Sequence, residues 1–173
     1  MPSTYTLISS NVLSSSAASV TFSAIPSTYT DLVLRLSTRT DLADTSVNIY
    51  TTFNGDTATN YSGTRVANYA GGADSARNSS QTKFSLGPWS EGTNLTASTF
   101  ANSELYIPSY TASQNKPVSS FDAVENNNAS TAYVIATANL WRNTAAITSV
   151  TMAPYSGNFV SGSSFYLYGI KSS

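Results

Sequence analysis

The residues best suited to catalysis in this sequence are its carboxylates, because the chain contains no histidine and no cysteine. It therefore lacks the commonest general base, the thiolate nucleophile and the usual zinc ligands. Asp122 and Glu125 stand three residues apart, a spacing that places them on opposite faces of a strand. Glu91 and Glu104 have no carboxylate partner close by in the sequence. Because glycoside hydrolysis needs two carboxyl groups facing one substrate, we interpret all four as solvated charges and expect no enzymatic activity.

Three aspartates flank one predicted strand, residues 47–53, and their oxygens are of the kind that binds Ca²⁺. Asp41 and Asp44 precede this strand, and Asp56 follows it. Their spacing matches neither the EF-hand loop nor a repeated calcium-binding motif. We therefore expect the protein to bind neither a metal nor any other cofactor.

The aromatic residues form a third candidate group, with eleven tyrosines and two tryptophans. Such side chains stack on sugars or anchor protein interfaces. Trp89 lies in the turn sequence GPWS, where we expect a partly exposed indole and a candidate interface residue. The alternative for Trp89 is packing over the end of a strand. Trp141 ends an apolar segment, and we assign it to the core.

The elements that position these residues are strands, because hydrophobic residues recur with a period of two along most of the chain. In residues 31–39, for example, Leu32, Leu34 and Leu36 share one face. The predicted strands are residues 5–12, 19–25, 31–39, 47–53, 65–69, 82–86, 103–107, 119–124, 132–141, 147–152 and 163–170.

Glycine, proline and asparagine separate these segments. At Asn54–Gly55 and at Lys116–Pro117, for example, we place breaks between strands. About ten short strands joined by such turns are typical of an antiparallel β-sandwich or barrel. Residues 57–80 and 108–117 are predicted surface loops. No linker composition interrupts the chain, so we predict one domain over residues 1–173, with residues 1–4 as an extended N-terminal arm.

The composition excludes two further classes of function. Only 10% of residues are charged and the net charge is -1, while the chain has 31 Ser, 23 Thr and 15 Asn. The eight Lys and Arg residues are scattered and form no stripe that would bind nucleic acid. The longest apolar segment, residues 132–141, is far too short to cross a membrane. A neutral, hydroxyl-rich surface instead suits a protein surrounded by other proteins.

The last segment, SSFYLYGI at residues 163–170, is unusually aromatic for the end of a chain. As a strand it points Phe165 and Leu167 to one side and Tyr166 and Tyr168 to the other. Either it is an inner strand covered on both sides by the same chain, or its tyrosine side contacts another subunit. Tyr166, Tyr168, Tyr5 and Trp89 are therefore our candidate subunit-interface residues.

Three groups of segments resemble small virion proteins of tailed bacteriophages, especially phages of cyanobacteria and marine bacteria. The first group is residues 5–8, 20–26 and 29–34, the second is residues 53–56 and 60–62, and the third is residues 141–142, 147–150, 157–159 and 165–170. The resemblance spans nearly the whole chain, and its motifs are strand and turn signatures without catalytic residues. It implies a jelly-roll-like sandwich that decorates a capsid or forms part of a tail fibre or adhesin.

These observations favour a capsid decoration (cement) protein on the outer surface of the virion. As partners we expect the major capsid protein and copies of the chain itself in a homotrimer. The sequence has neither a repetitive stalk nor a coiled coil, as a fibre would need. The alternative is a tail-tip module that recognises host surface glycans through its Tyr and Trp loops. A glycan-cleaving enzyme is disfavoured, because no acid–base pair is present.

Overall fold

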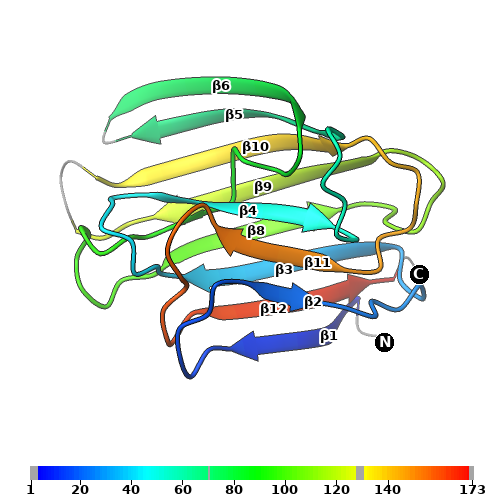
Figure 1. Cartoon of the computed structure of the whole chain (residues 1–173), viewed down its shortest axis with the longest axis horizontal. Coiled ribbons are helices and arrows are strands. Elements are labelled where there is room, and N and C mark those ends of the chain that lie inside the picture. Colours follow the sequence, from blue (N-terminus) through cyan, green and yellow to red (C-terminus); the bar gives the residue numbers. More distant parts are fainter. Residues whose placement is uncertain (1–3, 70, 128–130, 172–173) are drawn as a thin grey trace.

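The computed structural model describes residues 4–69, 71–127 and 131–171. The regular secondary structure in this part consists of β-strands alone. Twelve strands form two antiparallel sheets packed face to face, which confirms the predicted all-β sandwich. In Figure 1 the smaller sheet lies in front of the larger one. The described part has no helix long and apolar enough to span a membrane. Residues 1–3 of the predicted arm lie outside the described residues.

The two sheets differ in size. The large sheet has the spatial order β1 (Tyr5–Val12), β12 (Ser164–Ile170), β3 (Asp31–Thr38), β8 (Ala101–Ile107), β9 (Lys116–Val124), β10 (Tyr133–Trp141), β5 (Tyr61–Tyr69) and β6 (Gly72–Gln81). The small sheet has the order β2 (Val20–Phe22), β11 (Val150–Pro154), β4 (Val47–Phe53) and β7 (Trp89–Ser90).

Eight of these strands are nested as in a jelly roll. β1 pairs with β12, β2 with β11, β3 with β8, and β4 with β7. Successive pairs alternate between the two sheets, so that one long nested hairpin folds over into a sandwich. The other four strands, β9, β10, β5 and β6, extend the large sheet beyond β8. The expected jelly-roll-like sandwich is therefore present, with a large sheet twice as wide as the small one.

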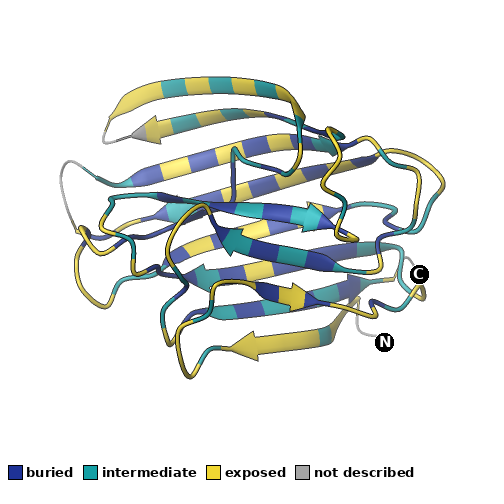
Figure 2. Ribbon diagram, viewed as in Figure 1, coloured by how far each residue is buried: buried dark blue, intermediate teal, exposed yellow. Residues whose placement is uncertain are grey.

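The main core lies between the sheets because most strands turn alternate apolar residues inward. Leu32, Leu34 and Leu36 of β3 are buried, as their spacing predicts. Figure 2 shows the same alternation of buried and exposed residues along β8, β9 and β10. Burial of one leucine side chain contributes about 1.5–3 kcal/mol, so this pattern fixes which side of each strand faces the core.

An aromatic cluster fills the core near the turn at Asn54. Trp141 is fully buried and stacks on Tyr61 at 6.4 Å between ring centroids. Phe53 meets Trp141 edge to face at 5.5 Å. Trp141 is thus a core residue, as predicted. Edge-to-face and stacked pairs stabilise a core beyond their buried area, by about 0.5–1.5 kcal/mol each.

The predicted loop at residues 57–80 is wrong, because most of it forms the β5–β6 hairpin. β6 reads GADSARNSSQ and lacks alternating large apolar residues. It lies at the edge of the large sheet, where its side chains are exposed or half-buried on both sides. A strand in that position needs no apolar face, and hydrophobic periodicity therefore gives no signal for it.

Two further local predictions are wrong. Lys116 was expected to lie in a break between strands, but it begins β9 and its side chain is buried. Its ammonium group donates to the carbonyl oxygens of Ala112 and Gln114. These bonds replace the water that a lysine normally needs, and burial lowers the pKa of Lys116. Residues 82–86 form no strand, although Phe84 of this segment is buried in the core.

The C-terminal strand β12 lies inside the large sheet, between β1 and β3. Phe165 and Leu167 are fully buried toward the small sheet, whereas Tyr166 and Tyr168 are half-buried on the opposite side. The described chain places no further layer over that side (Figure 1). Within the described residues, the tyrosine side of this strand is therefore only partly covered by its own chain, and contact with another subunit stays a prediction.

Gly169 of β12 gives a first testable prediction. A methyl group added there would overlap the ring of Tyr29, which packs directly on the glycine. We expect Gly169→Ala to lower the free energy of unfolding by about 1–3 kcal/mol through overpacking. Urea unfolding measures this loss. The same change in a Tyr29→Ala background should cost much less, and equal costs in both backgrounds would contradict the proposed overlap.

Candidate functional site

The broadest uncovered surface of the molecule is the side of the large sheet that faces away from the small sheet, hereafter the outer face. Among the described residues, eight large hydrophobic side chains are exposed. Seven of them lie on the outer face by their strand register: Tyr5, Leu7, Val12, Val66, Tyr106, Phe121 and Val134. Exposed apolar side chains gathered on one face indicate an interaction surface.

Strand pairing assembles this face from parts of the chain that are far apart in the sequence. Side chains of directly paired residues point to the same side of a sheet. One row across the sheet, hereafter the middle row, contains Ser10, Tyr166, Arg35, Glu104, Phe121, Ala136, Val66 and Ser75. The row thus joins residues from β1 to β6 in one line.

Arg35 is a central charged residue of the outer face, and several neighbours hold its side chain. Its Nε donates to Glu104 Oε2 at 2.8 Å, and both side chains are about half exposed. The guanidinium also lies 5.8 Å from the ring centroids of both Tyr5 and Tyr168. The hydrogen bond with Glu104 raises the pKa of Arg35 above its ordinary value. Arg35 is therefore held in place before any partner arrives.

The tyrosines around Arg35 contact one another. Tyr168 stacks on Tyr166 at 6.5 Å and meets Tyr5 edge to face at 6.4 Å. Tyr106 donates its hydroxyl to Asp31 Oδ2 at 2.8 Å, and this bond raises the pKa of Tyr106. The structure thus brings three of the predicted interface residues, Tyr5, Tyr166 and Tyr168, into one cluster.

Shallow hollows lie on both sides of the Phe121 ring. One, of about 510 Å³, is lined by Arg35, Asn102, Glu104 and Phe121. A second, of about 240 Å³, shares Glu104 and Phe121 and continues toward Tyr106 and Ala136. The exposed aromatic ring therefore stands between two depressions that offer charged and amide groups, an arrangement that fits either a protein side chain or a sugar ring.

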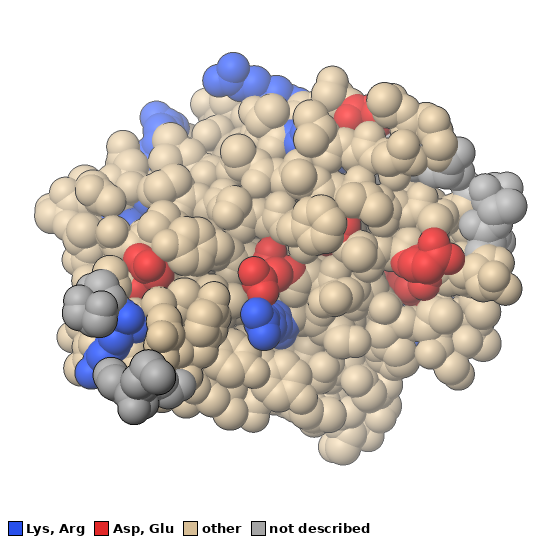
Figure 3. All heavy atoms as spheres, turned by 180° about the vertical axis from the view of Figure 1, so that it is seen from behind, with Lys and Arg blue, Asp and Glu red and all other residues tan. Residues whose placement is uncertain are grey.

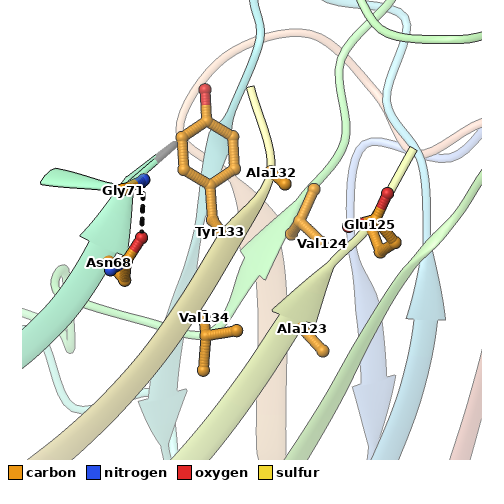
Figure 4. Close-up of a pocket in the computed structure, with 8 residues that line it drawn as sticks. All are labelled: Asn68, Gly71, Ala123, Val124, Glu125, Ala132, Tyr133 and Val134. Atoms are coloured by element: carbon orange, nitrogen blue, oxygen red, sulfur yellow. Dashed lines mark hydrogen bonds between the residues drawn. The ribbon is translucent and has the colours of Figure 1, made fainter. Parts of the chain in front are cut away.

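A third hollow, of about 200 Å³, lies where β5, β9 and β10 reach the edge of the molecule. Figure 4 shows Tyr133, Val124 and Val134 around it, with Glu125 at one side. Asn68 Oδ1 accepts a hydrogen bond from the backbone N–H of Gly71 at 2.9 Å. The lining is chiefly apolar, so this hollow extends the apolar character of the outer face rather than adding a polar site.

No protein-family model, no curated protein and no solved structure matches this chain. The resemblance of the sequence to phage virion proteins is therefore a hypothesis. The properties of the outer face itself must carry any functional proposal.

The outer face is nearly free of charge. Figure 3 views the molecule from this side, where a few isolated red and blue groups stand in a largely uncharged surface. The central charges, Arg35 and Glu104, neutralise each other. Such a surface lacks the basic stripe that nucleic acid requires, and it presents little charge that must lose its hydration when a protein binds.

The four carboxylates considered as catalytic candidates each have their own partners in the fold. Glu91 is buried and pairs with Arg39, and Glu104 pairs with Arg35 on the outer face. Asp122 is buried, whereas Glu125 is exposed and accepts a hydrogen bond from the N–H of Asn127. Glu91 and Asp122 are therefore not the solvated charges that we expected, because inward-facing partners hold them within the fold.

The three aspartates considered as calcium ligands each have their own hydrogen-bond donors. Asp41 accepts from the backbone and side chain of Asn158, which lower its pKa. Asp44 accepts from Tyr155. Asp56 accepts from Asn60 and from Trp141 Nε1, among other groups, and its pKa is lowered as well, chiefly by Asn60. Within the described ranges, no three acidic residues approach one another closely enough to hold a metal ion.

Trp89, the fourth predicted interface residue, does not join the cluster. Its side chain is only 6% exposed, so the expectation of a partly exposed indole is wrong. The indole Nε1 donates to the carbonyl oxygen of Leu86, and the ring packs against Tyr133 and Arg65 on the inner side of the large sheet. The turn sequence correctly indicates that no long strand runs through this segment. The indole nevertheless points into the fold, because its apolar surface is buried there.

Sequence reasoning missed Arg35, Glu104, Phe121, Val66 and Val134 as members of this surface. Each is separated by many residues from its cross-strand neighbours, so only the strand register brings them together. Phe121 did carry a signal. It occupies the outward position of a strand whose inward positions already include Val118 and Val124.

Proposed function

We propose that this chain is a structural protein of a bacteriophage virion that decorates the capsid and stabilises the head shell. The observation that carries the proposal is the outer face, which has seven exposed apolar side chains and a preformed cluster of Arg35 and tyrosines that includes some of them. Tyrosine and arginine are the residues that most often dominate protein–protein binding energy. An extended face of this kind fits assembly with other proteins better than the turnover of a small substrate.

Other features support a role within an assembly. The jelly-roll sandwich is a fold used by viral capsid proteins, among others. The net charge of -1 gives little self-repulsion, so copies can be packed at high density. The proposed partners are the major capsid protein and further copies of the chain, on the outside of the particle.

The number of copies per particle tests the proposal. A decoration protein covers the lattice, so purified virions should contain hundreds of copies when the protein is quantified against the major capsid protein. Particles that lack it should lose their DNA more readily on heating or osmotic shock. A handful of copies per particle, or unchanged head stability, would contradict decoration and indicate a tail location instead.

One observation favours a second candidate, a tail-tip module that binds host surface glycans. Phe121 is 57% exposed between two hollows, and Arg35, Asn102 and Glu104 line one of them. A sugar ring can stack on the phenyl group while these polar groups bond its hydroxyls. A glycan array probed with the purified protein tests this, with Phe121→Ala as the control variant. Binding that persists in the variant would exclude this site.

A further inference from the structure

We infer that the outer face binds a second copy of this chain, in a two-fold arrangement whose axis runs along the strands between β3 and β8. Such an interface is isologous, so every contact must occur twice with the roles of the two copies exchanged. The axis places β3 over β8 of the partner, β12 over β9, and β1 over β10. The inference concerns the purified protein and does not depend on its place in a virion.

The charges of the middle row are complementary under this operation. Arg35 of β3 and Glu104 of β8 are direct cross-strand partners, one on each side of the axis. The rotation therefore sets Arg35 of one copy over Glu104 of the other, and Glu104 over Arg35. Each copy keeps its own pair at 2.8 Å, and the two pairs together form a four-membered charge network at the centre. Any arrangement that set the two arginines against each other would be repulsive.

The apolar groups match as well. In the middle row, Tyr166 of β12 faces Phe121 of β9, because each stands one strand outside the Arg35–Glu104 pair. In the next row toward the end of β1, the rotation sets Val12 over Val134. These two pairs thus join an aromatic ring to an aromatic ring and an aliphatic group to an aliphatic group, without any change in register. The exposed apolar residues of β1, β9 and β10 are covered together.

The size of the face is sufficient for a stable interface. Six strands at a spacing of about 4.8 Å and seven residues at about 3.3 Å span roughly 29 Å by 23 Å. Two such faces cover roughly 1,300 Å² in total, within the range of specific protein interfaces. The strands β5 and β6 extend beyond this footprint. A two-fold dimer of this kind differs from the homotrimer that the sequence led us to expect, and the oligomeric state in solution distinguishes the two.

Cross-linking tests the geometry, since the chain has no natural cysteine. Ser164 and Ala123 lie on strands three positions apart in one sheet, roughly 14 Å, but face each other across the proposed axis. We expect differently tagged chains carrying Ser164→Cys and Ala123→Cys, when co-expressed, to be joined by a short bismaleimide. Each variant alone should give far less covalent dimer. Equal cross-linking within and between variants would overturn the arrangement.

Charge reversal tests the central contact. Light scattering after gel filtration should give a dimer for the natural chain, and Arg35→Glu should weaken dimerisation more than about tenfold, because like charges then meet at the axis. The double variant Arg35→Glu/Glu104→Arg should restore the dimer. Arg77→Glu, an exposed change on β6 of the same face but outside the footprint, should leave it intact.

The melting temperature of dilute, monomeric samples separates loss of association from loss of folding. The inference requires that Arg35→Glu melts like the natural chain there, since its pair is half exposed and contributes little to the fold. A natural chain that is monomeric or trimeric at high micromolar concentration would overturn the inference. That result would leave the decoration proposal untouched, because the number of copies per virion tests the proposal separately.

Discussion

Replacing Arg39 with methionine should lower the free energy of unfolding by about 3–5 kcal/mol, the largest effect that we expect from any single polar residue. Arg39 follows β3, and its guanidinium is buried. It contacts Glu91 Oε2 at 3.3 Å and donates to the carbonyl oxygens of Thr96, Thr99 and Leu95 at 2.8–3.2 Å. Methionine has a similar length but no donors, so the loop at residues 91–99 loses these contacts with the guanidinium and keeps its hydrogen bonds near Thr40.

The reason for the large effect is the carboxylate left behind. Glu91 is fully buried, and burial already raises its pKa although Arg39 and Thr99 act in the opposite direction. Without the guanidinium, a buried charge has no counter-ion. The double variant Arg39→Met/Glu91→Met removes that charge, and we expect it to be more stable than Arg39→Met alone. Urea unfolding of all variants measures the difference.

Arg142→Met serves as the matched control. Arg142 is exposed and donates one hydrogen bond to the carbonyl oxygen of Thr59 at 2.7 Å. Its replacement should change the free energy of unfolding by less than about 1 kcal/mol. If Arg39→Met were no more destabilising than this control, the buried guanidinium would not be what holds the loop.

Strands with one apolar side could be predicted from the sequence, whereas strands at the margin of the core could not. The strand β4 begins and ends at the predicted residues, because its apolar residues alternate and Asn54 closes it with a positive φ of 53°. The edge strand β6 carries small and polar residues on both sides and gives no such signal. β7 is only two residues long and contains Trp89. The turn residues Gly87 and Pro88 precede it, so the sequence pattern indicates a turn there and not a strand.

Residues of the outer face could be predicted only where the pattern within a single strand indicated them. Tyr166 and Tyr168 were found because a single segment has bulky groups on both sides. Arg35 and Glu104 are 69 residues apart, and neither stands out within its own strand. The same is true of the Arg39–Glu91 pair, which depends on how a loop returns to β3. Pairings of this kind arise from strand order, which local sequence patterns do not specify.

Asp122 gives the second large effect, a change in stability with pH. Its side chain is buried on the inner side of β9, where Oδ1 accepts from the backbone N–H of Trp89 at 3.3 Å and Oδ2 from the hydroxyl of Ser120 at 3.1 Å. Burial raises the pKa of Asp122 to about 6, and its hydrogen bonds, from Ser103, Ser120 and Trp89, only partly oppose that rise. Asp122 therefore binds its proton more tightly in the folded protein than in the unfolded chain.

The direction of the pH effect follows from this raised pKa. In the unfolded chain an aspartate titrates near 3.8, so the unfolded state releases its proton first as pH rises. The contribution of Asp122 is thus complete below about pH 4 and is lost as pH rises through about 6. Above pH 7 the loss amounts to about 3 kcal/mol. We expect the natural chain to be more stable at pH 5 than at pH 7.5 by about 1–2 kcal/mol.

Asp122→Asn should remove this dependence and stabilise the protein at pH 7.5, because a neutral amide fits the same partners. Its oxygen can accept from Trp89 N–H while its nitrogen donates to Ser120 Oγ. Ser120 can adjust, since it shares a 2.7 Å hydrogen bond with Thr137 in which either hydroxyl donates. The chain has no histidine, so few other side chains titrate between pH 5 and 7.5. Urea unfolding at both pH values measures the effect, and a variant with the same pH profile as the natural chain would assign the titration to another group.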